Sequence, residues 1–166
     1  MTYPDNPSTI NKLELQNVYN TATFSENLET GTELNSSATA AWSGHKNLQT
    51  VVLGDTDQEV VFDKAKYGTT AILIPQVFDH GTTGGKVSLY VAYTIKNQNG
   101  TTLKQRNTFE LDDYSGVYDD GTVDSLTPQW VKGYRYTYNL TFGLTKVYFA
   151  PSVTPWTDIT VDLPQL

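Results

Sequence analysis

The chain has 166 residues and no cysteine, so its length suits a single domain, and disulfides, thiolate metal sites and cysteine nucleophiles are excluded. Its 18 acidic residues outnumber the 11 basic ones, and a net charge of −7 argues against binding to nucleic acid or to anionic membranes. No apolar run reaches the roughly 18 residues needed to span a bilayer, and residues 1–7 are polar and carry no export signal.

The first part of the chain predicts one strand followed by a long irregular segment. The strand covers residues 10–19, where Leu13 and Leu15 alternate with polar side chains. Residues 20–47 are polar and weakly periodic, and residues 36–42 are their only plausible helical turn.

Three short apolar segments come next. Residues 48–53 and 59–62 predict two short strands on either side of a Gly-Asp turn. Residues 71–74 form a continuous apolar run, which is typical of a strand buried on both faces, and Pro75 ends it.

The strongest local pattern predicts a hairpin over residues 87–111. One face of its first strand carries Val87, Leu89, Val91, Tyr93 and Ile95. The turn at residues 97–100 ends with Gly100, which tolerates a positive φ angle. The apolar residues that share one face of the return strand are Leu103, Phe109 and Leu111.

Three more strands are expected toward the C-terminus. Residues 131–142 place on one face Tyr134, Tyr136, Tyr138, Leu140 and Phe142. After Gly143 a strand begins that has Val147 and Phe149 in phase, and Pro151 marks either its end or a sheet edge. The last, short strand has Ile159, Val161 and Leu163 on one face and Asp158, Thr160 and Asp162 on the other.

Together these elements predict an all-β fold. We expect a single antiparallel β-sandwich of about seven to eight strands, with a Greek-key or transthyretin-like topology. Residues 1–166 contain no internal repeat and no linker that would divide them, so we expect one domain.

No motif predicts catalysis. His45 and His80 are expected in polar, glycine-flanked loops without metal-ligand spacing. The acidic segment 112–124 has the carboxylates and glycines that calcium sites use, but Tyr118 stands where an EF-hand needs its second oxygen ligand. Solvated turns are therefore favoured over a calcium site, and we expect no enzyme, no bound metal and no cofactor.

Trp42 and Trp130 are the candidate ligand contacts, because an exposed aromatic ring can stack on a sugar. A surface glycan-binding module is therefore the alternative function. Burial in a core is the more common role for such rings, since each one removes a large apolar area from water. The tyrosines of residues 134–138, which lie in phase with Leu140, favour the same interpretation.

Several segments together resemble a known family. In chain order they are the apolar run 71–74 with Pro75-Gln76, the hairpin after it, the Trp-x-x-Gly-x-x-Tyr-x-Tyr pattern of residues 130–138, the strand at 147–149 and the Val-x-x-Trp of residues 153–156. This order resembles the C-terminal domain of Bacteroidales fimbrillins, the pilins of type V pili. Residues 11–20 are similar to the opening strand of that domain.

The resemblance implies a structural subunit or adhesive domain of an extracellular pilus or fimbria on the cell surface. Its partners would be other pilin subunits or further copies of itself, joined by strand exchange, together with a host or microbial surface ligand. The candidate donor strand would carry Ile159, Val161 and Leu163, and pairing of this segment within its own sandwich is the favoured alternative. The chain would be either the C-terminal domain of a longer precursor or a reduced relative.

Overall fold

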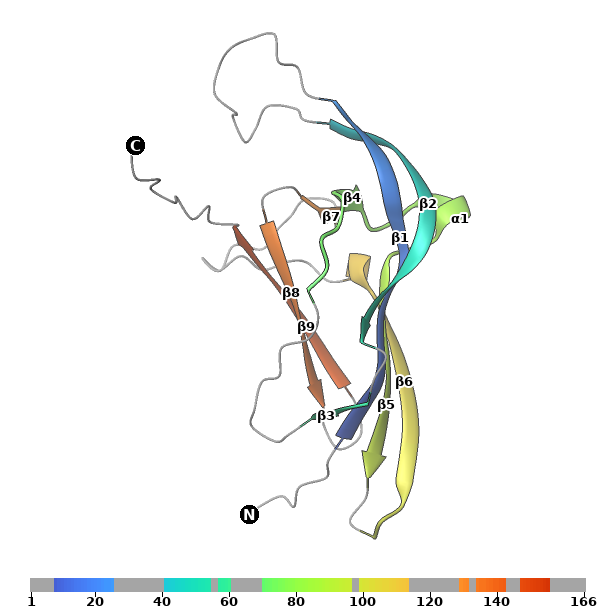
Figure 1. The fold of residues 1–166 in the computed structure, drawn as a ribbon, viewed down its shortest axis with the longest axis vertical. Helices are drawn as coiled ribbons and strands as arrows, with labels where there is room; N and C mark the ends of the chain where they lie inside the picture. Colours follow the sequence, from blue (N-terminus) through green and yellow to red (C-terminus); the bar gives the residue numbers. More distant parts are fainter. Residues whose placement is uncertain are drawn as a thin grey trace, which may run out of the picture.

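A computed structural model describes residues 8–25, 41–54, 57–60, 70–96, 99–113, 129–131, 134–142 and 147–155. In this part of the chain the strands are antiparallel and form two layers, as predicted (Figure 1). The larger sheet contains β1 (Ser8–Ser25), β2 (Ala41–Gly54), β3 (Gln58–Val60), β5 (Ser88–Lys96) and β6 (Thr102–Glu110). The smaller pairs are β4 (Gln76–Val77) with β7 (Gln129–Trp130), and β8 (Tyr134–Phe142) with β9 (Val147–Pro155).

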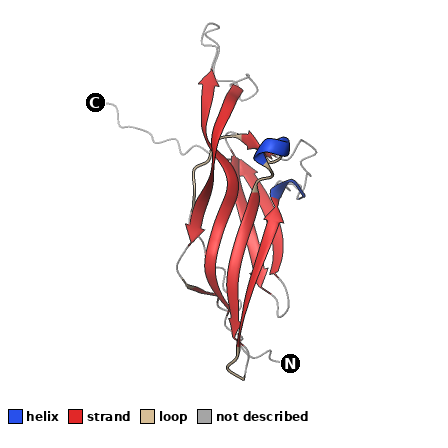
Figure 2. Ribbon diagram, turned by 90° about the vertical axis from the view of Figure 1, so that its right-hand side faces the viewer, coloured by secondary structure: helices blue, strands red, loops and turns tan. Residues whose placement is uncertain are grey.

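The large sheet has the order β2-β1-β5-β6, and β3 lies beside the first residues of β1. The pairing of β1 with β5 ends at Gln16 and Ser88, whereas its pairing with β2 continues to Ser25 and Ala41. Residues 19–25 and 41–48 therefore form a two-stranded extension, the β1–β2 arm, which projects past the end of β5 (Figures 1 and 2).

The core lies between the large sheet and the β8–β9 pair. The inward face of the first hairpin strand is fully buried, as its alternation predicts, and consists of Val87, Leu89, Val91, Tyr93 and Ile95. Burial along β8 alternates strictly, so this strand turns one face to the core. Each fully buried aliphatic side chain stabilises the fold by about 1.5–3 kcal/mol before the entropy of ordering is subtracted.

Aromatic rings connect the two layers. Phe109 of β6 stacks on Phe149 of β9 at a centroid distance of 5.0 Å, and Tyr138 of β8 stacks on the same ring at 5.6 Å. Tyr93 of β5 meets Phe142 of β8 edge to face at 5.2 Å. Ring pairs in these geometries add to the stability that area burial provides, so they fix how the two layers sit against each other.

The strongest sequence patterns are confirmed. The β5–β6 hairpin closes through a turn in which Gly100 has a φ angle of 81°. The strands β8 and β9 pair along their whole length, from Tyr134 opposite Pro155 to Phe142 opposite Val147. Pro151 lies within β9 opposite Tyr138, and β8 is the only described strand that pairs with β9. Of the two predicted roles of Pro151, the sheet edge is therefore confirmed and the strand end is not.

The prediction of an irregular segment over residues 20–47 is wrong where the structure describes it. β1 extends to Ser25, and β2 begins at Ala41, inside the stretch that was expected to form a helical turn. The cause is the β1–β2 arm: because much of its side-chain surface meets water, its strands do not need the apolar alternation that marks a half-buried strand.

The apolar run at residues 71–74 is also not a strand. It pairs with no described strand, and Ile72 is 93% exposed. The paired residues come later, in β4, and are followed by the short helix α1 (Gly81–Gly84). No helix in the described part of the chain is both long and apolar enough to cross a membrane.

Candidate assembly surface

The large sheet ends in β2 and β3 on one side and in β6 on the other, and the structure describes no strand beyond any of them. The exposed face of β6 carries Lys104 and Arg106, neither of which forms an ion pair with a described residue. β2 contains two residues with positive φ angles, Gly44 at 61° and Asn47 at 58°. Charges and local backbone irregularities are features by which proteins discourage the addition of a further strand.

Gln76 forms hydrogen bonds with β1 beyond Gln16, where the pairing of β1 with β5 ends. Its side chain is only 4% exposed, and its Oε1 accepts a hydrogen bond of 2.9 Å from the backbone N–H of Tyr19. Its Nε2 donates to the carbonyl of Tyr19 at 3.2 Å and to that of Ile74 at 3.1 Å. The amide thus takes the place of a neighbouring strand's peptide group, which gives a physical role to the Pro-Gln pair of the sequence pattern.

The ring of Tyr19 lies near two histidines. Its centroid is 4.2 Å from that of His80 and 5.8 Å from that of His45. Nε2 of His45 lies 2.8 Å from the carbonyl oxygen of Pro75. Both ring nitrogens of His80 are buried, and neither has a hydrogen-bond partner in the part of the chain that the structure describes.

Burial lowers the pKa of His80 below its ordinary value of 6.5. The nearby carbonyl of Val77 and the carboxylate of Asp79 favour the charged ring, while His45 disfavours it. Desolvation outweighs the favourable contacts, so the folded chain holds His80 neutral at a pH where the unfolded chain protonates it.

We expect the free energy of unfolding to decrease as the pH falls below 6.5, because His80 then binds a proton in the unfolded state but not in the folded state. Replacing His80 by Phe should reduce this slope, whereas His45→Gln should leave most of it in place. Urea unfolding of the three proteins at a series of pH values measures the effect. A slope that is identical in the parent chain and His80→Phe would refute it.

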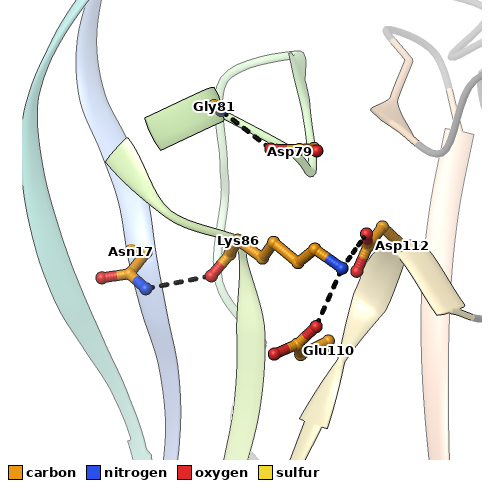
Figure 3. Close-up of polar contacts among 6 residues, drawn as sticks. All are labelled: Asn17, Asp79, Gly81, Lys86, Glu110 and Asp112. Atoms are coloured by element: carbon orange, nitrogen blue, oxygen red, sulfur yellow. Dashed lines mark hydrogen bonds and ion pairs between the residues drawn. The ribbon is translucent and has the colours of Figure 1, made fainter. Parts of the chain in front are cut away.

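Lys86, which lies two residues before β5, contacts Asn17, Glu110 and Asp112 (Figure 3). Its Nζ lies 2.8 Å from a carboxylate oxygen of Asp112 and 3.0 Å from one of Glu110, and its carbonyl accepts a 3.0 Å hydrogen bond from the side chain of Asn17. Asn17 has a φ angle of 59° and lies in a bulge of β1. Pairing with Asp112 and Glu110 raises the pKa of Lys86 above its ordinary value. The ion pairs connect the segment before β5 to the end of β6, and the hydrogen bond from Asn17 connects the same segment to β1.

The acidic segment is described only at its beginning. Carboxylate oxygens of Glu110, Asp112 and Asp113 lie within 4.8 Å of one another, while residues 114–124 are outside the described residues. Lys86 already contacts two of these three carboxylates, so a protein cation compensates part of the negative charge that would attract a metal ion. We therefore assign no metal to this group.

The two candidate ligand tryptophans have different surroundings. Trp130 is 5% exposed, donates a 2.6 Å hydrogen bond from Nε1 to the hydroxyl of Tyr138 and meets Phe78 edge to face. This environment favours the core-packing interpretation of Trp130. Trp42 is half-buried on the β1–β2 arm, next to Phe24, at an interplanar angle of 49°. These two rings do not form the flat platform that sugar stacking uses.

The candidate donor residues Ile159, Val161 and Leu163 lie outside the described residues, and their role stays a prediction. Sequence reasoning assigned no role to Gln76 or Tyr19. The Pro-Gln pair was visible in the sequence, but its contact is made with a residue 57 positions away, and no local pattern reveals such a partner.

The fold and these contacts define an all-β protein of two packed layers, in which the polar groups described above hold strands in place. The fimbrillin-like family matches residues 2–156, and the chain belongs to this family, as the sequence pattern predicted. The family consists of structural pilins, which supports a general role as a pilus or fimbrial subunit. Comparisons with curated proteins and with solved structures give no match.

Proposed function

We propose that this chain is a structural subunit of a pilus or fimbria on the bacterial cell surface and that it assembles by strand donation. The family match over residues 2–156 carries the proposal. Its partner is another pilin subunit or a second copy of the chain. Whether residues 1–166 form one domain of a longer precursor also stays a prediction.

The donor segment is the C-terminal alternation of Ile159, Val161 and Leu163. A strand that adds to a sheet edge forms main-chain hydrogen bonds with it, while every second side chain enters the partner's apolar surface. Burial of three such side chains contributes about 1.5–3 kcal/mol each before association costs. The competing arrangement is pairing of this segment within its own sandwich.

Replacing Ile159, Val161 and Leu163 together by Asp should abolish polymer formation, because charged side chains do not enter an apolar surface without a partner. Light scattering after size exclusion and negative-stain electron microscopy measure polymer length. The matched control is Thr160→Asp, which places one charge on the polar face of the same segment and should still assemble.

The melting temperature of the monomer distinguishes the two arrangements. If the triple variant melts like the parent chain and no longer polymerises, the segment acts between subunits. Polymers of normal length in the triple variant would eliminate donation by this segment. Loss of monomer stability without any change in assembly would place the segment in its own sandwich.

A further inference from the structure

We infer that the acceptor for the donated strand is the open edge of β1 over residues 19–25, on the side of the β1–β2 arm that faces away from β2. This inference rests on the proposed strand donation and adds to it the position at which the donor binds. It follows from the backbone of the arm, from the side chains that flank it and from a comparison with the other edges of the sheet.

The backbone of Tyr19 shows which way the free edge of β1 faces. Gln76 bonds both the N–H and the carbonyl of Tyr19, so these groups point away from β2. In a strand, the backbone groups of every second residue point to the same side, so those of Thr21 face the same way as those of Tyr19. The register shift between Thr21 and Thr23 places the additional residue in β2, so the alternation of β1 continues to Thr23. Among the residues that the structure describes, none bonds the backbone of Thr21 or Thr23 on that side.

This edge differs from those of β6 and β2. Residues 21–25 carry no charge and contain no positive φ angle, whereas β6 presents Lys104 and Arg106, and β2 is irregular at Asn47. The β1 side of the arm is therefore uncharged and free of positive φ angles over residues 21–25, and the hydrogen bonds of Gln76 to Tyr19 mark where this free edge begins. β5 pairs with β1 only as far as Ser88. A strand placed on this edge would lie next to β1 in the same position as β5, beyond the end of β5.

The flanking side chains match an amphipathic strand. One face of the arm carries the rings of Phe24 and Trp42, with centroids 5.0 Å apart and Phe24 47% exposed. The next residue back along β1, Thr23, projects to the opposite face. A donated strand with apolar residues at every second position would cover the rings with one face and keep its polar residues beside the threonines. The segment that contains Ile159 and Val161 has this alternation.

Disulfide trapping tests the position directly, since the chain contains no cysteine of its own. Two full-length single variants, Thr23→Cys and Thr160→Cys, are mixed, allowed to assemble and oxidised. We expect a disulfide between residues 23 and 160 of different subunits, identified by peptide mapping, in about tenfold excess over the control, because bridging requires close Cα atoms. The control mixture pairs Thr160→Cys with Arg106→Cys on β6.

The outcomes separate this inference from the proposed function. If the chains polymerise but residue 160 is trapped at position 106, or at neither position, the acceptor is not the β1 edge and strand donation itself stands. If the unmodified chain and both single variants fail to polymerise, the proposed strand donation is wrong, and so is the assignment of the acceptor. If polymers form and residue 160 is trapped at position 23 only, the result supports both strand donation and the β1 edge as its acceptor.

Discussion

Replacing Trp130 by Ala should lower the free energy of unfolding by about 3–5 kcal/mol, the range expected for truncating a buried aromatic side chain. The ring is 5% exposed and packs edge to face on Phe78 at 5.1 Å. Its removal also takes away the donor to the hydroxyl of Tyr138, whose pKa is raised because that side chain is buried. Urea unfolding followed by circular dichroism measures the loss.

The matched control is Trp42→Ala on the β1–β2 arm. This ring is half-buried and packs on Phe24, so we expect a loss below about 1.5 kcal/mol. Trp130→Phe keeps an aromatic ring but loses the N–H donor, and its effect should lie between the two. Equal losses for Trp42→Ala and Trp130→Ala would contradict the placement of Trp130 in the core.

Replacing Gln76 by Leu should lower the free energy of unfolding by about 2–3 kcal/mol, because the N–H and carbonyl of Tyr19 then lose their partner in a partly buried position. Leu is similar in size, so little packing is lost. Gln76→Glu keeps an acceptor for the N–H of Tyr19 and loses the donor to its carbonyl, and we expect an intermediate loss. The exposed Gln105→Leu on β6 should change stability by less than about 0.5 kcal/mol.

Hydrogen exchange shows whether the effect arises at the bond itself. The amide of Tyr19 should be protected in the parent chain and should exchange much faster in Gln76→Leu, while the amides of β5 stay protected. Unchanged protection of Tyr19 in a destabilised Gln76→Leu variant would mean that the loss comes from packing and that the Gln76 side chain does not substitute for a strand.

The sequence alone determined the elements that face the core on one side and water on the other. The strands at residues 88–96 and 134–142 were predictable because alternate side chains are buried there, and burial of alternate residues leaves a period of two in the sequence. The turn at Gly100 was predictable because a positive φ angle favours glycine. Part of the family pattern, the hairpin and the Tyr-x-Tyr of residues 136–138, lies in these same strands, whereas the apolar run 71–74 does not form a strand.

Only the tertiary structure decided the features that depend on distant partners or on water at both faces. The β1–β2 arm lacks apolar alternation because much of its surface is solvated, so its strands could not be distinguished from irregular chain. The structure places Trp130 against Tyr138, whereas Trp42 lies on the arm, and composition cannot separate two residues of the same type. Gln76 supports Tyr19 across 57 positions, since a hydrogen bond forms between groups that folding brings together, whatever their separation along the chain.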